Sequence, residues 1–159
     1  MRIRPMTGDD LDPVVAIAAG LEQAPQWPRS AYEAALDPTK PRRIALVAED
    51  PTDGEIKGFV IGLLAPPEAE LETIAADARV QRQGIGRQLL DELAAAAGRA
   101  GVTEVHLEVR ASNRPARTLY RAQGFAEVGV RTGYYVDSKE DAVLMRLVLG
   151  DVVPGGNRG

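Results

Sequence analysis

Two glycines flanked by arginines form the stretch of this chain whose composition most directly suggests chemistry. Gly84 and Gly86 lie one residue apart in the segment VQRQGIGRQLL (80–90), and an apolar pattern with helical spacing follows them. The first turn of a helix presents N–H groups without intrahelical partners and a partial positive charge, so a glycine-rich approach lets a phosphate bind there. A glycine pair can equally shape a strand-to-helix turn with solvated arginines around it. The segment thus raises two interpretations, a phosphate site and a plain turn.

Two familiar phosphate-binding loops do not fit this stretch. A P-loop needs Gly-Lys-Ser/Thr, which does not follow Gly86, and a dinucleotide fingerprint needs a third glycine where Leu89 stands. What remains is Gln81-x-x-Gly84-x-Gly86, preceded by LETIAAD (71–77), which is typical of a strand.

Composition limits the class of protein. The chain has 159 residues, of which 45% are hydrophobic and 26% charged, and this is ordinary for one globular domain. The net charge of -4 provides no basic field for nucleic acid or an anionic membrane. Positive charge is local, because Arg79, Arg82 and Arg87 lie in an acid-free interval between Asp77 and Asp91.

The chain also lacks the residues of several catalytic centres. It has no cysteine, which excludes disulfides, a thiol nucleophile and zinc–thiolate sites, and its single histidine, His106, cannot form a histidine metal cluster. We therefore expect no metal and interpret His106 as a structural or surface residue. The N-terminal MRIRPMTGDD lacks the apolar segment of a signal peptide, and no window approaches a membrane span, which predicts a cytoplasmic location.

Hydrophobic periodicity alternates between strand and helix along the chain. Asn113 is a good N-cap for the last helix, and Gly124 is a plausible residue just beyond its C-terminus. Residues 150–159 are expected to form a flexible tail. The expected helices cover 7–21, 28–36, 85–100 and 114–123, and the expected strands cover 2–4, 42–49, 55–65, 71–77, 102–110, 125–131 and 142–149.

This succession, centred on Gln81-x-x-Gly84-x-Gly86, resembles the GNAT family of acetyl-CoA-dependent N-acetyltransferases over nearly the whole chain. WPRSAYEAAL (27–36), LEVRASNRPARTLY (107–120), GF (124–125) and GYYVDSKEDAVLM (133–145) are similar to its RimI type, the ribosomal-protein-alanine N-acetyltransferases. Val80 and the run Ala76-Asp77-Ala78 depart from the common pattern without removing a group that the chemistry needs. The resemblance implies one GNAT domain over residues 1–149. It would be an α/β (α+β) fold whose central mixed, mostly antiparallel sheet has about seven strands and about four flanking helices.

The resemblance implies acetyl-CoA as the co-substrate. Backbone N–H groups of the glycine turn would hold the pyrophosphate, and strand residues 74–76 would pair with the pantetheine arm. Asn113 has a complete structural explanation as an N-cap, to which the family position adds a cofactor contact. The implied cofactor-binding residues are Ile74, Ala75, Ala76, Gln81, Arg82, Gln83, Gly84, Ile85, Gly86, Arg87, Asn113 and Tyr120.

The two catalytic candidates are Glu108 and Tyr120. Strand alternation in VHLEVR (105–110) points Glu108 away from the apolar side, where it could reach a cleft or simply pair with Arg110 in solvent. The resemblance implies that Glu108 is the base that deprotonates the amine. It also implies that Tyr120, otherwise an ordinary core tyrosine, is the acid that protonates the departing thiolate. Glu72 is the reserve base.

The acceptor is expected at Trp27, Glu72, Tyr134 and Tyr135, although the aromatic residues among them fit a hydrophobic core equally well. An α-amine has a pKa near 7.7 to 8.0 and a lysine near 10.4, so the modest bases in this chain suit an α-amine better. We therefore expect direct acetyl transfer, in a ternary complex, to the amino terminus of a protein, specifically a ribosomal protein. A small-molecule amine acceptor and a non-enzymatic acyl-CoA-binding domain stay open as alternatives.

Overall fold

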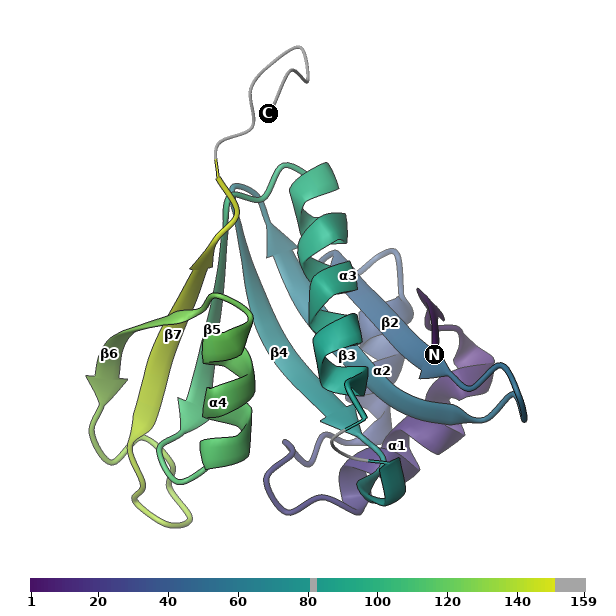
Figure 1. Cartoon of the computed structure of the whole chain (residues 1–159), viewed down its shortest axis with the longest axis horizontal. Helices are drawn as coiled ribbons and strands as arrows, with labels where there is room; N and C mark the ends of the chain where they lie inside the picture. The colour runs from purple at the N-terminus through teal and green to yellow at the C-terminus, as the bar shows by residue number, and fades with distance from the viewer. Residues whose placement is uncertain (81–82, 151–159) are drawn as a thin grey trace.

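Seven strands form one mixed sheet in the described part of the computed structural model, which covers residues 1–80 and 83–150. Their order is β1-β2-β3-β4-β5-β7-β6, in which β4 and β5 are parallel and the other neighbours antiparallel (Figure 1). The predicted fold class is confirmed. The strands are β1 (Arg2–Pro5), β2 (Arg43–Glu49), β3 (Ile56–Ala65), β4 (Glu68–Ala76), β5 (Glu104–Arg110), β6 (Ala126–Arg131) and β7 (Ala142–Val148).

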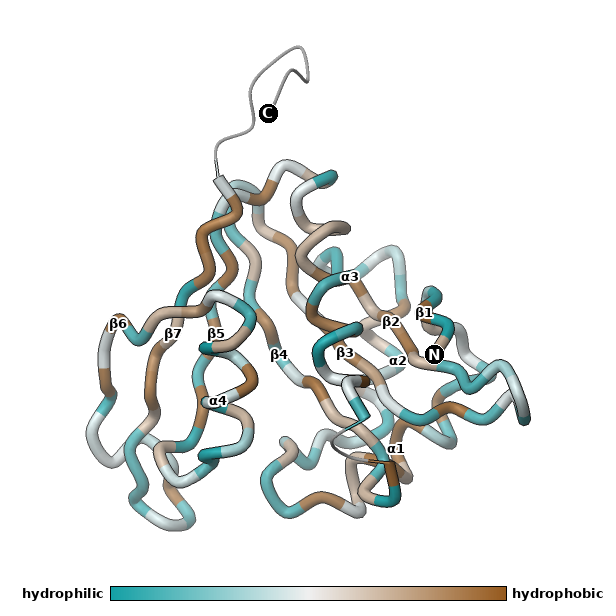
Figure 2. The backbone as a smooth tube through the Cα atoms, in the orientation of Figure 1, coloured by the Kyte–Doolittle hydropathy of each residue, from teal (hydrophilic) through white to brown (hydrophobic). Residues whose placement is uncertain are grey.

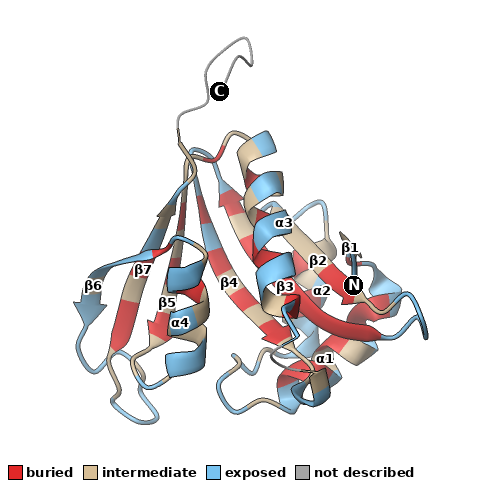
Figure 3. Cartoon of the chain, viewed as in Figure 1, coloured by how far each residue is buried: buried red, intermediate tan, exposed pale blue. Residues whose placement is uncertain are grey.

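Helices cover both faces of the sheet and enclose two hydrophobic cores. On one face, α1 (Leu11–Ala19) and α2 (Arg29–Leu36) pack against β2 and β3. On the other face, α3 (Ile85–Arg99) and α4 (Arg114–Ala122) enclose the second core. Apolar segments concentrate in the strands (Figure 2). Buried positions alternate along β4 and β5, run almost continuously along β3, and line the inner sides of the helices (Figure 3). No helix in residues 1–80 and 83–150 has the length and apolar character needed to cross a membrane.

Most predicted boundaries agree with the structure to within a few residues. The Asn113 side chain accepts a hydrogen bond from the backbone N–H of Ala116 at 3.3 Å, and Gly124 has a φ of 100°, as expected for the two ends of α4. The first predicted helix starts instead as a 3-10 turn, Gly8–Asp10, and ends at Ala19. Strand β4 begins three residues before the predicted start, since the tight Pro66–Pro67 connection leaves room for further pairing with β3. Residues 151–159, expected to be a tail, lie outside the described residues.

Helix α3 lies directly on two glycines of β3. A Cβ atom added to Gly58 would lie 2.9 Å from Ile85 Cγ2 and 2.9 Å from the Ala75 carbonyl oxygen. A Cβ added to Gly62 would lie 3.0 Å from Leu93 Cδ1. These distances are shorter than an ordinary van der Waals contact. The close packing of α3 requires glycine at position 58, where backbone blocks a side chain, and at position 62 a side chain would require Leu93 to move.

Candidate active site

Strands β4 and β5 pair only near their N-terminal ends. Their parallel ladder begins at Glu68–Glu104 and ends at Glu70–His106, although both strands continue beyond it. Figure 1 shows the strands separating toward their C-terminal ends, and we call this separation the fork. Among the described residues, the edge of β4 facing the fork has no neighbouring strand over residues 72–75. Backbone N–H and C=O groups at such an edge can pair with an extended guest.

Glu72 forms a β-bulge in β4 at the start of the fork. Ile61 of β3 pairs with Thr73, whereas the next residue, Gly62, pairs with Leu71, so Glu72 is the extra residue. The bulge reverses the alternation of the strand. Leu71 packs in the core beneath α3, while Thr73, opposite Ile61, faces the layer of α1 and α2.

Glu108 lies where strand alternation predicts it. Its neighbours Leu107 and Val109 are buried in the core of α3 and α4, so Glu108 faces the opposite side of the sheet with 28% of its side chain exposed. Arg131 of β6 places Nη1 3.6 Å from Glu108 Oε1. The hydroxyl of Tyr134 donates a hydrogen bond to the same carboxylate, and this contact raises the pKa of Tyr134. Glu108 is thus a polar, partly solvated group held from two sides.

Tyr120 lies on the other face of the sheet, in α4. It is 7% exposed, and its ring packs on Phe125 with the centroids 5.7 Å apart. Burial raises the pKa of its phenol well above the ordinary value, with a smaller contribution from Tyr135. A phenol in this environment stays protonated at every physiological pH, as a proton donor must. Tyr120 and Glu108 are on opposite faces of the sheet, and a ligand between β4 and β5 in the fork could reach toward both.

The loop between β6 and β7 carries the predicted tyrosine pair to the face of Glu108. The rings of Tyr134 and Tyr135 pack edge to face with centroids 5.2 Å apart, and the Arg110 guanidinium lies 4.1 Å from the centre of the Tyr135 ring. Arg110 also binds Asp137 at 3.1 Å, which fixes the loop against β5. Tyr134 is 44% exposed, so it forms part of the accessible surface beside Glu108.

Two other predicted acceptor residues are engaged in structural contacts. Arg43 of β2 donates from Nε to Glu72 Oε1 at 2.7 Å and from Nη2 to Oε2 at 3.4 Å. For Glu72 to act as a base, this ion pair would have to open. Trp27 packs on Tyr32 with ring centroids 5.2 Å apart, against the core of α1 and α2. The structure thus favours the core interpretation for Trp27.

The backbone of the glycine turn is open to a diphosphate at Gly84. Gly84 has a φ of 79°, and a Cβ added to it would meet no atom of the described residues within 4 Å apart from its chain neighbours, so its backbone is open on that side. Gly86 also packs closely, because a Cβ there would lie 3.0 Å from Leu119 Cδ2 of α4, and its contact to the cofactor stays a prediction. Arg87 is exposed on the first turn of α3. Gln81 and Arg82 lie outside the described residues.

Together, the fork and this turn fit acetyl-CoA. Ile74 and Ala75, with Ala76 next to them, form the part of β4 along the fork, while Gln83, Gly84 and Ile85 lead into α3. An extended arm could pair with the first group and a diphosphate could bind at the second. Asn113 uses its side-chain oxygen to cap α4. Their assignment as cofactor contacts stays a prediction.

Sequence reasoning missed the basic partners of the acidic residues. Arg43 pairs with Glu72, and Arg131 pairs with Glu108. Each arginine lies on a strand remote in sequence from its partner, so no local sequence pattern predicts these contacts. Glu70, on the same face, was also missed, although the alternation of Glu68, Glu70 and Glu72 was a visible signal.

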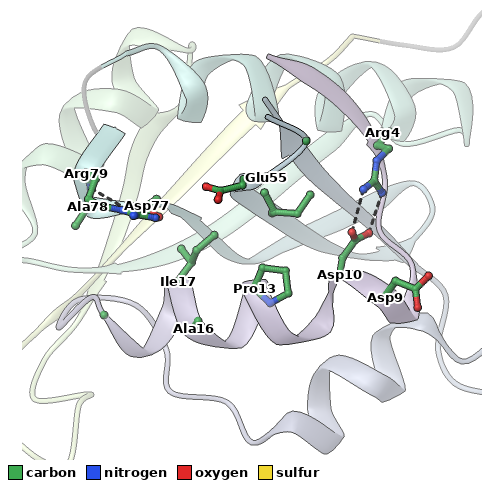
Figure 4. Close-up of a pocket in the computed structure, with 13 residues that line it drawn as sticks. Arg4, Asp9, Asp10, Pro13, Ala16, Ile17, Glu55, Asp77, Ala78 and Arg79 are labelled. Carbon is green, nitrogen blue, oxygen red and sulfur yellow. Dashed lines mark hydrogen bonds and ion pairs between the residues drawn. The ribbon is translucent and has the colours of Figure 1, made fainter. Parts of the chain in front are cut away.

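A separate depression of about 610 Å³ lies between α1 and the end of β4, away from these residues (Figure 4). Its charged lining is largely neutralised internally. Arg4 donates to both oxygens of Asp10 at 2.8 and 2.9 Å, and Arg79 binds Asp77 at 2.7 Å. The described residues that line it include none of the predicted site residues, so we assign it no part in the candidate site.

Comparisons with known proteins place this geometry in a family. Residues 15–125 match the acetyltransferase (GNAT) family. The chain is 43% identical over 97 residues to a [ribosomal protein bS18]-alanine N-acetyltransferase of Escherichia coli, covering 60% of this chain and 66% of that protein, slightly less than two thirds of its length. It is 40% identical over 129 residues to the N-alpha-acetyltransferase RimI of Mycobacterium tuberculosis, covering 79% and 77% of the two chains. The crystal structure of the E. coli ribosomal-protein-S18-alanine N-acetyltransferase superposes with a TM-score of 0.83 at 30% identity, covering 99% of both chains.

Proposed function

This chain belongs to the GNAT acetyltransferase family, and from that premise we propose that it transfers an acetyl group from acetyl-CoA to the N-terminal α-amine of a protein, specifically a ribosomal protein. The observation that carries the proposal is the position of Glu108. It lies on the accessible face of β5 beside the fork, with Tyr134 next to it and Tyr120 buried across the sheet. The similarity to N-terminal acetyltransferases supports the choice of acceptor.

Two groups of the chain would carry the proton transfers, and a third would hold the co-substrate. Acetyl-CoA supplies the activated acetyl thioester. Glu108 takes a proton from the incoming α-ammonium, directly or through a water, and its partly solvated position lets it pass that proton on. Tyr120 keeps a proton at its phenolic oxygen and donates it to the departing thiolate. The N–H groups at the start of α3 would hold the diphosphate.

The ionisation of amines favours an α-amine as the acceptor. At pH 7 about a tenth of α-amines are neutral, whereas fewer than about one lysine side chain in a thousand is neutral. The candidate base, Glu108, is a carboxylate, and carboxylates are ordinarily weak bases. A modest base is sufficient for the first kind of amine and poorly suited to the second.

A competition assay tests the acceptor. The protein is incubated with acetyl-CoA and two peptides of the same sequence, one with a free α-amine and the other with a blocked α-amine and a lysine. We expect labelling of the first peptide, as read by mass spectrometry. Preferential labelling of lysine, or of a small polyamine added to the mixture, would refute the acceptor. The absence of any transfer would refute the activity itself.

A further inference from the structure

Glu70, Glu72 and Glu108 all face the side of the sheet from which an acceptor would approach. Glu70 pairs in the β4–β5 ladder with His106, and opposed residues in a ladder share a face. Glu108 is two residues beyond His106 in β5 and therefore shares that face. Glu72 lies on it as well, because it binds Arg43 there.

Glu70 differs from the other two carboxylates in having no ion pair among the described residues. Glu72 is bound by Arg43 at 2.7 Å, and Glu108 lies 3.6 Å from Arg131. No hydrogen bond or ion pair to Glu70 occurs within residues 1–80 and 83–150. Its ladder neighbour His106 directs Nε2 to other carboxylates, 3.0 Å from Glu68 Oε1 and 3.5 Å from Glu104 Oε1.

Negative charge and burial outweigh positive charge around Glu70, although Arg43 and His106 both attract its carboxylate. Desolvation by the surrounding protein is the main cause that raises the pKa of Glu70, and repulsion from Glu72 and Glu108 adds to it. Glu70 is nevertheless exposed, so a cationic N–H donor can reach its carboxylate from solvent.

We propose that Glu70 binds the positive charge of the acceptor amine, holding the α-ammonium at the start of the fork before Glu108 removes its proton. The inference rests on the proposed function, since it requires that an amine enters from this face. Glu70 would be an acceptor-binding residue that sets the affinity for charged amines. Glu72 is unsuited to this role because Arg43 already neutralises it.

The test is a thermodynamic cycle that compares the affinities of two enzymes for two peptides. Wild type and Glu70→Gln, each saturated with CoA, are titrated by calorimetry with a peptide that wild type acetylates, and with the same peptide already acetylated at its amine. We expect Glu70→Gln to weaken binding of the free-amine peptide about 5-fold, the upper range for a pair at an exposed carboxylate. Binding of the acetylated peptide should not change. In turnover, the peptide KM should rise by the same factor while kcat stays within about 3-fold.

Two variants act as controls. Glu68→Gln removes a carboxylate two residues earlier on the same face and should leave both affinities unchanged, since Glu68 is already close to His106. Glu70→Asp keeps the charge and should restore most of the preference for the free amine. An equal loss for both peptides, or no loss for either, would overturn the role of Glu70.

The cycle separates this inference from the proposed function. If wild type acetylates lysine or a polyamine instead of an α-amine, the proposed acceptor is wrong. The cycle is then run with that amine and its acetylated form, and a loss confined to the free amine would still support Glu70. If wild type acetylates no amine, the proposed function and the role of Glu70 are both refuted.

Discussion

The role of Tyr120 as the proton donor can be tested by a pair of tyrosine substitutions. Tyr120→Phe removes one hydroxyl and keeps the ring that packs on Phe125, so the free energy of unfolding should change by less than about 1 kcal/mol. Burial keeps the phenol protonated, so the wild-type donor is present at every working pH. The loss of activity should therefore be the same from pH 6 to pH 9.

The magnitude follows from what the hydroxyl would do. A positioned general acid contributes about 10²- to 10⁴-fold to a rate, so kcat should fall at least about 100-fold, or about 2.7 kcal/mol in the barrier. The affinity for acetyl-CoA, measured by calorimetry, should stay within about 3-fold of wild type, since one hydroxyl among many contacts is lost. Released CoA can be followed with a thiol reagent without background from the protein, because the chain has no cysteine.

Tyr32→Phe is the matched control. Tyr32 is fully buried in α2, and its hydroxyl has no hydrogen-bond partner among the described residues. Removing this unsatisfied group should leave turnover unchanged and raise the free energy of unfolding by about 1 kcal/mol, as measured by urea denaturation. If Tyr120→Phe keeps activity within about 3-fold of wild type, or if Tyr32→Phe loses as much, Tyr120 is not the acid.

Three further predictions concern the base, the glycine turn and acid stability. Glu108→Gln should lower kcat/KM most near pH 7 and recover toward pH 9, where the α-amine deprotonates unaided; a pH profile parallel to that of wild type would contradict its role as base. Gly84→Val should weaken acetyl-CoA binding about 10-fold in calorimetry, because the valine side chain would block the approach of a diphosphate to the backbone at a φ of 79°. Gly98→Ala is the control, since Gly98 lies in open space on α3; it should stabilise the fold by about 0.5 to 1 kcal/mol without affecting binding. Hydrogen bonds from Arg79 lower the pKa of Asp77 to about 2, so its contribution to stability is complete above about pH 4 and is lost as the pH falls toward 2. Urea denaturation should accordingly show a weaker dependence on pH over that range in Asp77→Asn than in wild type.

The parts of the fold that sequence predicted correctly depend on neighbours in the chain. The direction of Glu108 follows from alternation within one strand, and the Asn113 cap follows from the residues next to it. The bulge at Glu72 was not predictable in this way, because an extra residue is defined only against the partner strand. The ion pair of Arg131 with Glu108 likewise depends on how β6 and β7 fold back onto β5.

Trp27 shows the same limit for the candidate site. A tryptophan beside prolines suits a peptide cleft as well as a core, and only the position of Tyr32 in α2 distinguishes the two interpretations. The three-residue error at the start of β4 has a related cause. The pairing of Glu68 with Ala65 across a two-proline connection depends on β3 and not on the residues of β4 alone.

The two glycines beneath α3 make the tilt of that helix a property of β3. Gly58 contacts the helix at Ile85, its first residue, and Gly62 contacts it at Leu93, two turns later. Helix α3 therefore packs closely against β3 at two points, one at its first residue and one about two turns later. A methyl group added at Gly58 would raise the end that leads from the glycine turn, while one added at Gly62 would raise the middle. Substitutions at Gly58 and Gly62 would then displace different parts of α3, and we expect them to change the affinity of the glycine turn for acetyl-CoA to different extents.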